Sequence, residues 1–272
     1  MQNLNGKRVV VTGGSQGLGL AMVEALAACG ANVIAIGRDR ANLSSAEQAG
    51  AAVIAGDATD ANLMNKVVRE EVPDVLILNA GARLTVKPID QQSWDQFSAV
   101  WNTDVKAGLV GIQAALRTPM KRGGRVLVMS SGAAMVLAVP FIAPENLSLS
   151  GGYIGAKRML WFMAHSANAV SRERDLGIQF QVLVPMQLIP GTSLGHHVAA
   201  TSAEIEGVSI EEHVMKRYGS ILRPAQVGQQ VAELLGDPRY RYGVADGFRN
   251  ESDILGLDVK YDPKSAAIPE TR

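Results

Sequence analysis

The chain has 272 residues, enough for one large domain or two small ones, and it carries equal numbers of basic and acidic residues, 26 of each. Apolar residues make up 47% of it and charged residues 19%, which supplies a buried core and excludes a disordered chain. The neutral charge gives no reason to expect nucleic acid or an anionic membrane as a partner. No apolar run is long enough to span a bilayer, and the polar start with a single cysteine fits a cytoplasmic protein.

Short apolar runs alternate with helical patterns through most of the chain. Strands that are apolar throughout are buried on both faces, and strands that alternate with helices form a parallel sheet through right-handed crossovers. We therefore expect an α/β fold, a doubly wound parallel sheet in three α/β/α layers (a Rossmann fold) in a single domain. The predicted strands are 7–12, 32–36, 51–55, 74–78, 125–129 and 178–184, and the predicted helices are 18–29, 40–49, 61–71, 93–116 and one that contains Tyr153.

The regular alternation of predicted strands and helices ends after the sixth strand. Residues 186–195 are rich in proline and glycine, and helices are predicted over 202–218 and 224–235, followed by a short strand over 241–245. We expect a catalytic domain over residues 1–246, in which segment 186–220 covers a substrate. The polar remainder, 247–272, is expected to be disordered or to lie across a neighbouring subunit.

A glycine-rich turn at residues 12–19 (TGGSQGLG) follows the first strand and opens a helix. Glycines let the backbone approach a pyrophosphate, and a helix N-terminus offers it free N–H groups. No lysine stands where the phosphate loop of nucleoside triphosphatases needs one. The turn therefore predicts a dinucleotide site. The four histidines show no metal-ligand spacing, and no metal is expected.

Tyr153 and Lys157 stand four residues apart in a predicted helix, so both side chains point to one side of it. An ammonium beside a phenol stabilises the phenolate. A tyrosine tuned in this way can exchange a proton at neutral pH, which the interconversion of an alcohol and a ketone requires. A pair with this spacing also occurs by chance on helix surfaces, so its meaning depends on the other motifs.

Those motifs stand in an order that resembles the short-chain dehydrogenase/reductase family, in its compact single-domain form, over residues 6–243. The motifs are the turn at 12–19, Asn79-Ala80-Gly81 after the fourth strand, Asn102 in the long helix, Ser131 after the fifth strand, and Tyr153 with Lys157. The resemblance implies that Tyr153 transfers a proton and that Lys157 tunes it and binds the nicotinamide ribose. It further implies that Ser131, or less readily Ser130, orients the substrate carbonyl and that Asn102 holds a relay water.

The resemblance also implies a set of cofactor-binding residues. Asn79 would support the sheet and the cofactor ribose, Gly81 would let the cofactor lie close, and Asp57-Ala58 would contact the adenine. The full set is Gly13, Ser15, Gln16, Gly17, Leu18, Gly19, Arg38, Asp57, Ala58, Asn79, Ala80, Gly81, Tyr153, Lys157, Pro185 and Leu188.

The end of the second strand bears on which nicotinamide cofactor is used. Dinucleotide sites that prefer NAD(H) carry an acidic residue there for the ribose hydroxyl, but here the position holds Gly37 and Arg38 follows. A guanidinium suits a phosphate, because it is planar and always charged. NADP(H) is therefore expected rather than NAD(H), with Asp39 as the residue that argues the other way.

Two segments depart from the family pattern. The stretch between Ser131 and Tyr153 is long, and its residues 136–152 would form an apolar flap. The threonine expected to contact the nicotinamide amide comes late, at Thr192. Residues 83–86, the flap and 186–188 make a mostly apolar substrate wall near His196 and His197, which favours an apolar ketone or secondary alcohol.

The sequence thus predicts an NADP(H)-dependent oxidoreductase that interconverts a ketone and a secondary alcohol. Two alternatives stay open: a nucleotide-binding regulatory or scaffold protein of the same fold that has lost turnover, and a dehydratase or epimerase. By resemblance, a homodimer or homotetramer is expected, formed through the helices at 93–116 and 153–171.

Overall fold

The computed structural model describes residues 4–82, 84–118, 120–135, 151–250 and 254–257. Its centre is an eight-stranded sheet in the order β3-β2-β1-β4-β5-β6-β7-β8, with every neighbouring pair parallel except β7 and β8. The order reverses beside β1, which is the doubly wound arrangement that the sequence predicts. The strands are β1 (Arg8–Thr12), β2 (Asn32–Gly37), β3 (Ala52–Ala55), β4 (Val75–Leu78), β5 (Arg125–Met129), β6 (Gln179–Pro185), β7 (Ala245–Phe248) and β8 (Leu255–Gly256).

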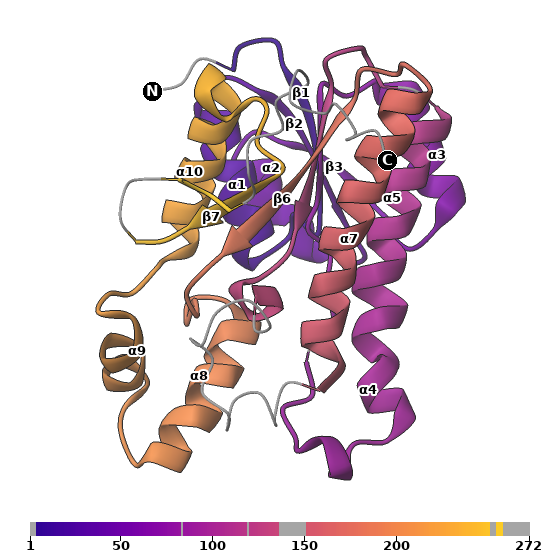
Figure 1. Cartoon of the computed structure of the whole chain (residues 1–272). Helices are drawn as coiled ribbons and strands as arrows, with labels where there is room; N and C mark the ends of the chain where they lie inside the picture. The colour runs from indigo at the N-terminus through magenta and orange to yellow at the C-terminus, as the bar shows by residue number, and fades with distance from the viewer. Residues whose placement is uncertain (1–3, 83, 119, 136–150, 251–253, 258–272) are drawn as a thin grey trace, which may run out of the picture.

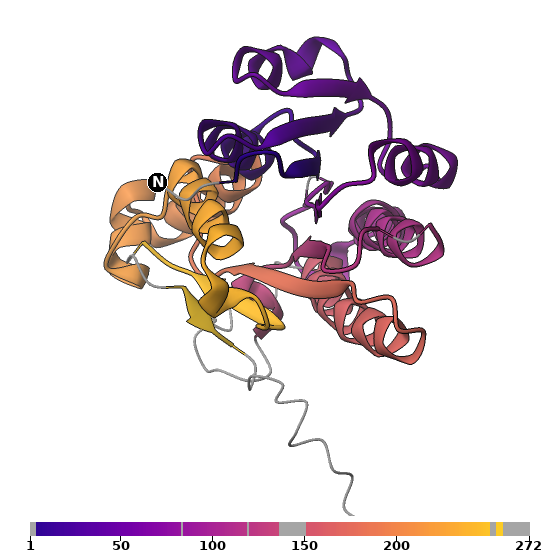
Figure 2. The same cartoon turned by 90° about the horizontal axis from the view of Figure 1, so that it is seen from above.

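Helices cover both faces of this sheet and complete three layers (Figure 2). One face carries α1 (Gly17–Ala28), α2 (Ser44–Gln48) and α10 (Pro224–Gly236), and the other carries α3 (Ala61–Glu71), α5 (Lys106–Arg117) and α7 (Gly151–Glu173). The predicted fold class is therefore confirmed. The predicted helix over 40–49 is a short 3₁₀ turn, Ala41–Leu43, followed by α2.

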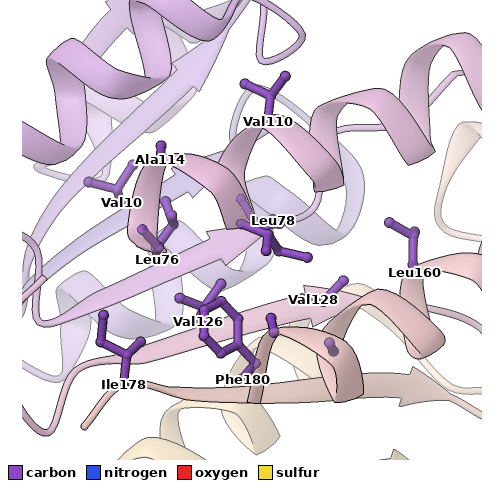
Figure 3. Close-up of a cluster of buried hydrophobic side chains, with 14 of the residues drawn as sticks. Val10, Leu76, Leu78, Val110, Ala114, Val126, Val128, Leu160, Ile178 and Phe180 are labelled. Carbon is purple, nitrogen blue, oxygen red and sulfur yellow. The ribbon is translucent and has the colours of Figure 1, made fainter. Parts of the chain in front are cut away.

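The core follows from the alternation of side chains along buried strands. Val10 of β1 packs on the face covered by α3, α5 and α7, whereas Val9 and Val11 pack on the face covered by α1 and α10. Both layers are apolar, as a sheet covered on both faces requires. Figure 3 shows the first layer, where the strand residues Val10, Leu76, Leu78, Val126, Val128 and Phe180, with Ile178 just before β6, meet residues of the covering helices, Val110, Ala114 and Leu160.

Three helices extend past the carboxyl ends of the parallel strands: α4 (Trp94–Val100), α8 (Ser193–Glu206) and α9 (Ile210–Tyr218) (Figure 1). The predicted single helix over 202–218 is wrong. The left-handed Gly207, with φ of 68°, ends α8, and Ser209 with Glu212 forms a capping box that starts α9.

The predicted helix over 93–116 is also interrupted. A π-helical turn, η3 (Trp101–Val105), joins α4 to α5. A π-helical turn contains more residues than an α-helical turn, so it changes which of the following residues face the sheet.

The end of the chain differs from the prediction. The last parallel strand lies at Ala245–Phe248 rather than 241–245, so the predicted boundary after residue 246 falls inside β7. β8 then pairs antiparallel with β7. The predicted flap lies outside the described residues except for 151 and 152, which begin α7, as does the tail beyond 257. In the part of the chain that is described, no helix combines the length and apolarity needed to cross a membrane.

Candidate active site

A single cavity of about 1260 Å³ lies at the carboxyl ends of the parallel strands. It runs from the glycine-rich turn and the end of β2 to the start of α7 and on to α9. All the residues predicted for the cofactor and for catalysis line it except Gly19 and Asn102. The fold therefore brings together residues that are distant in sequence.

The glycine-rich turn is locked against the end of β4 by polar contacts. The hydroxyl of Thr12, 1% exposed, donates to the carbonyl of Ile77 at 3.2 Å and accepts from the N–H groups of Asn79 and Ala80 at 3.0 and 3.2 Å. The Asn79 amide donates in return to the carbonyls of Thr12 and Gly13. These bonds tie Asn79, at the end of β4, to the end of β1 and the turn that follows it.

Two glycines of the turn serve different purposes. Gly13 has φ of 68°, and a Cβ there would lie 2.9 Å from the Cα of Ala80, so only glycine fits where the turn meets β4. Gly19 does not line the cavity, contrary to its predicted contact with the cofactor. A Cβ on Gly19 would lie 1.9 Å from the carbonyl oxygen of Gly13, so its role is to let α1 pack beneath the turn.

The end of the cavity beside β2 is polar. Arg38, Asn42 and Asp57 line it. The N–H of Thr59 donates to Asp57 at 2.8 Å and lowers the pKa of that carboxyl, and the charge of Arg38 adds to the effect. Asp39 does not line the cavity, because its carboxylate accepts from the N–H of Ala41 at 2.9 Å and from the Asn42 amide at 3.0 Å.

Lys157 forms a buried ion pair with Asp104. The Lys157 Nζ lies 2.9 Å from Asp104 Oδ2, and the two side chains are 7% and 2% exposed. The other carboxylate oxygen accepts from the N–H of Ala82 at 2.7 Å. A Cβ on Gly81 would lie 3.0 Å from the same carboxylate, so a larger residue there would crowd Asp104.

Two opposing effects act on the charge of Lys157. Burial by itself would lower the pKa of Lys157, but the Asp104 carboxylate, helped by the Tyr153 side chain, outweighs it and raises the pKa above its ordinary value. Lys157 therefore keeps its proton throughout the neutral range. Its Nζ lies 5.6 Å from the centre of the Tyr153 ring, close enough for the charge to act on the phenol.

Asp104, and not Asn102, is the residue of the long helix that faces Lys157. The Asn102 side chain is exposed, does not line the cavity, and donates only to the hydroxyl of Ser98 at 3.4 Å. The predicted relay role of Asn102 is therefore corrected. A signal was present in the sequence, because Asp104 lies on the same helical stripe as the buried small residues Ala107, Gly108 and Gly111.

The two serines after β5 have different partners. Ser130, 3% exposed, donates from its hydroxyl to the carbonyl of Lys157 at 2.9 Å, which fixes α7 to the end of β5. Ser131 is half-buried on the cavity wall, and its hydroxyl accepts from the N–H of Ala133 at 3.2 Å. Ser131 keeps its own proton to donate, as a role in holding a carbonyl requires.

The remaining wall lies beside β6 and β7 and contains residues that the sequence did not single out. Met186, Gln187 and Leu188 line it as expected, whereas His196 and His197 are exposed and do not. Thr192 lines the cavity and lies beside Gly17, where it also caps α8 by accepting from the N–H of Gly195. The residues not named individually are His213, Arg217, Tyr218 and Ser220, which fall within the predicted covering segment 186–220, and Arg249, which falls outside it.

Residues 7–143 match the model of the short chain dehydrogenase family, which is half of the chain. The chain belongs to this family. The recognition made from the sequence motifs is thereby confirmed, and with it the class of enzyme, a short-chain dehydrogenase/reductase that uses a nicotinamide cofactor. Among the described residues, no group of three or more His, Cys, Asp or Glu side chains could hold a metal ion.

Similar proteins cover most of the chain at low identity. It is 27% identical to the oxidoreductase asL5 of Sarocladium schorii, over 86% of this chain and 90% of that protein. It is 24% identical to L-fucose dehydrogenase of Rattus norvegicus, over 88% and 87% of the two chains. A blue fluorescent protein from a metagenomic library, solved in complex with NADPH, shares the fold with a TM-score of 0.66 and 24% identity, over 92% of this chain and 98% of that one.

Proposed function

We propose that the protein is an NADP(H)-dependent oxidoreductase that interconverts a ketone and a secondary alcohol. The observation that supports it best is a single cavity that joins the glycine-rich turn and Arg38 to Ser131, Tyr153 and Lys157. A cofactor held along the first part would present its reactive ring to the second. Direct observation of hydride transfer to a ketone tests the proposal.

The residues present fit a nicotinamide dinucleotide. Gly13 and Gly17 have φ of 68° and 56°, which leaves the backbone of the turn open to a close-lying pyrophosphate at the N-terminus of α1. Arg38, Asp57 and Lys157, the residues expected to meet the adenosine part and the nicotinamide ribose, all line the cavity. A bound nicotinamide supplies or accepts the hydride.

The chain's own residues handle the proton and the carbonyl. The Ser131 hydroxyl donates to the substrate oxygen and holds it beside Tyr153, whose hydroxyl gives that oxygen its proton during reduction. The Lys157 ammonium stabilises the phenolate left behind. The direction expected is reduction, because the cofactor inferred is mostly in its reduced form in cells.

Asp104 gives this site a feature that an asparagine relay would lack. Its carboxylate pairs with the Lys157 ammonium at 2.9 Å, holds it in place and keeps it protonated. The same negative charge offsets part of the field that Lys157 exerts on Tyr153. We propose that Asp104 is a positioning residue, which acts on the reaction through Lys157.

The preference for NADP(H) rests on the polar end of the cavity. Arg38 lines this end, and Asp39, the residue that argues for a ribose hydroxyl, does not line it and is engaged with Ala41 and Asn42. The exposed guanidinium of Arg38 suits the additional phosphate of NADP(H), with Asp57 as the carboxylate that shares this end of the cavity.

A binding protein of the same fold that has lost turnover is the main rival. Rapid mixing of the NADPH-loaded protein with a panel of ketones separates the two, because only the enzyme oxidises NADPH and so lowers the absorbance of the reduced nicotinamide. Consumption supports the oxidoreductase. Tight binding of NADPH without consumption for any ketone or aldehyde supports the rival, and release of water from a hydroxyl substrate without net oxidation indicates a dehydratase.

We also propose a homodimer or homotetramer formed through α4, α5 and α7. Large apolar side chains are exposed there: Trp94 is 74% exposed, Phe162 66% and Leu109 42%. An apolar face of this kind is typical of a subunit interface. Light scattering after size exclusion should show more than one chain, and Phe162→Glu should lower the measured mass to that of a monomer.

A further inference from the structure

His213 is a buried histidine on the cavity wall that the proposed mechanism does not use. It lies in the first turn of α9, is 2% exposed and lines the cavity. Neither of its ring nitrogens has a hydrogen bond of regular geometry with any described residue. A buried polar atom without a partner is costly, so such an atom at a cavity wall points to a ligand that supplies the partner.

The two ring nitrogens of His213 have different surroundings. Nδ1 lies 3.1 Å from the Oε1 of Glu206, the last residue of α8, and this contact lowers the pKa of the Glu206 carboxyl. Glu206 does not line the cavity, so the Nδ1 edge of the ring is turned toward α8. Nε2 is buried on the other edge and has no partner in the described part of the chain. It is therefore the nitrogen left to bind a group in the cavity.

The turn between α8 and α9 fixes the orientation of this ring. Gly207 ends α8 in the left-handed region, and the capping box of Ser209 with Glu212 starts α9 at once. This short connection brings Glu206 against His213. The ring is thus held before a ligand arrives, which reduces the entropy lost on binding.

The far end of α9 is tied to the end of β6. The Gln187 amide donates to the hydroxyl of Ser220, just after α9, at 3.0 Å, and Gln187 also accepts from the N–H of Asn250 at 2.9 Å. β6 pairs with β5, after which Ser131 follows. The wall that contains His213 therefore keeps a fixed position relative to the reacting centre, and one molecule can contact both.

We propose that the substrate carries a hydroxyl group besides its reacting carbonyl, and that the Nε2 of His213 binds this hydroxyl. A hydroxyl both donates and accepts, so it pairs with Nε2 in either protonation state of the ring. Leu84, Met135 and Met186 line the cavity as well and would cover the carbon chain between the two groups. This inference rests on the proposed function for the place of the carbonyl, and it changes the expected substrate from a wholly apolar ketone to a hydroxy ketone.

The test compares ligands with and without the hydroxyl. NADPH-loaded Tyr153→Phe protein is titrated by calorimetry with methyl ketones of five, six and seven carbons and with the terminal hydroxy derivative of each. We expect at least one hydroxy ketone to bind about tenfold more tightly than its parent. Adding His213→Phe should remove this advantage, because the phenyl ring fills the space without a nitrogen. His213→Gln should keep part of it, because its amide lies near the place of Nε2.

His196→Phe is the matched control, because His196 is exposed on α8 and does not line the cavity. It should leave the advantage intact. Nitrogen NMR of the labelled Tyr153→Phe protein gives a readout that does not depend on the folding of a His213 variant. The Nε2 resonance of His213 should shift with a hydroxy ketone and not with its parent.

Equal binding of every hydroxy ketone and its parent, or no binding of any hydroxy ketone, overturns the proposal. A full hydroxyl advantage in a less stable His213→Phe variant also overturns it, because the histidine would then serve only the turn between α8 and α9. An Nε2 resonance that does not respond has the same consequence.

Turnover of the same ketones by the wild-type chain is measured in parallel. A hydroxyl advantage that depends on His213, without turnover of any ketone, would sink the proposed function and leave the hydroxyl site standing. Equal turnover of both series, unaffected by His213→Phe, would do the reverse.

Discussion

Asp104 and Lys157 form an ion pair of 2.9 Å in which neither side chain is more than 7% exposed. The pair joins the π-helical turn before α5 to the first turns of α7, the two elements that frame the reacting centre. Because a buried charge is costly without a partner, each residue depends on the other for its ionised state. The protonated Lys157 on which the proposed chemistry rests is therefore a property of the pair.

Asp104→Asn should destabilise the protein by about 3 kcal/mol at neutral pH, since it leaves the Lys157 ammonium buried without its counter-charge. The pKa of Lys157 is raised in the folded chain, so the pair stabilises fully below the unfolded lysine's pKa of about 10.4 and the benefit is lost as pH rises through the folded value. Urea unfolding across this range should show the gap between variant and wild type closing at alkaline pH.

Asp95→Asn provides the control for that measurement, because Asp95 is an exposed carboxylate on α4. It should change stability by less than about 0.5 kcal/mol at every pH. Equal stability of Asp104→Asn and the wild type at neutral pH would mean that the ion pair contributes nothing.

The activity of two neighbouring variants should separate the predicted relay residue from the one found in the structure. Asn102→Ala should leave kcat/KM within about twofold of the wild type, because its side chain is exposed and outside the cavity. Asp104→Asn should lower kcat by about tenfold or more, because Lys157 is no longer held. A larger loss in Asn102→Ala than in Asp104→Asn would restore the relay to Asn102.

The choice between Asn102 and Asp104 shows where sequence reasoning stopped. Residues two apart on a helix face nearly opposite sides, so the prediction of Asn102 placed the catalytic residue on the side of the helix that faces solvent. The resemblance favoured an asparagine by residue type, whereas the stripe of small buried residues through Ala107 and Gly111 pointed to Asp104. Asn102 and Asp104 also both lie in the π-helical turn, where the spacing of residues around the helix differs from that of an α-helix. Hydrophobic periodicity does not predict such a turn, so the sequence alone did not show which side each residue faces.

Other parts of the fold were predictable because local and tertiary signals agreed. The bounds of α3 and β5 are those predicted, because Asp60 caps the helix and the strand is apolar from Val126 to Met129. The break between α8 and α9 had a signal in Gly207 and in the Ser209–Glu212 spacing. Arg249 had none, since only the pairing of β7 with β6 brings it to the cavity.

Arg38→Asp should shift the ratio of kcat/KM for NADPH over NADH by at least about tenfold toward NADH, because it removes the phosphate's partner and offers a carboxylate to the ribose hydroxyl. Steady-state rates with each cofactor measure it. Arg40→Gln is the matched control, since Arg40 is exposed, pairs with Glu47 and does not line the cavity. A wild-type enzyme that already prefers NADH would contradict the assignment of Arg38.

Thr12→Val should destabilise the chain by about 1–3 kcal/mol and weaken NADPH binding, since it leaves the N–H groups of Asn79 and Ala80 without their buried acceptor. Thr12→Ser keeps the hydroxyl and should restore both properties. Thermal unfolding and the fluorescence of bound NADPH report the two effects. An unchanged NADPH affinity in the valine variant would show that the turn does not depend on this contact.

The most direct test of the whole account is the rate of hydride transfer from NADPH to a ketone substrate in Tyr153→Phe. A single-turnover measurement, made beside a titration of NADPH affinity, separates chemistry from binding. The account predicts that transfer falls by at least about a thousandfold while NADPH affinity stays within about threefold of the wild type, because only the proton donor is lost. Transfer at the wild-type rate in Tyr153→Phe would contradict it.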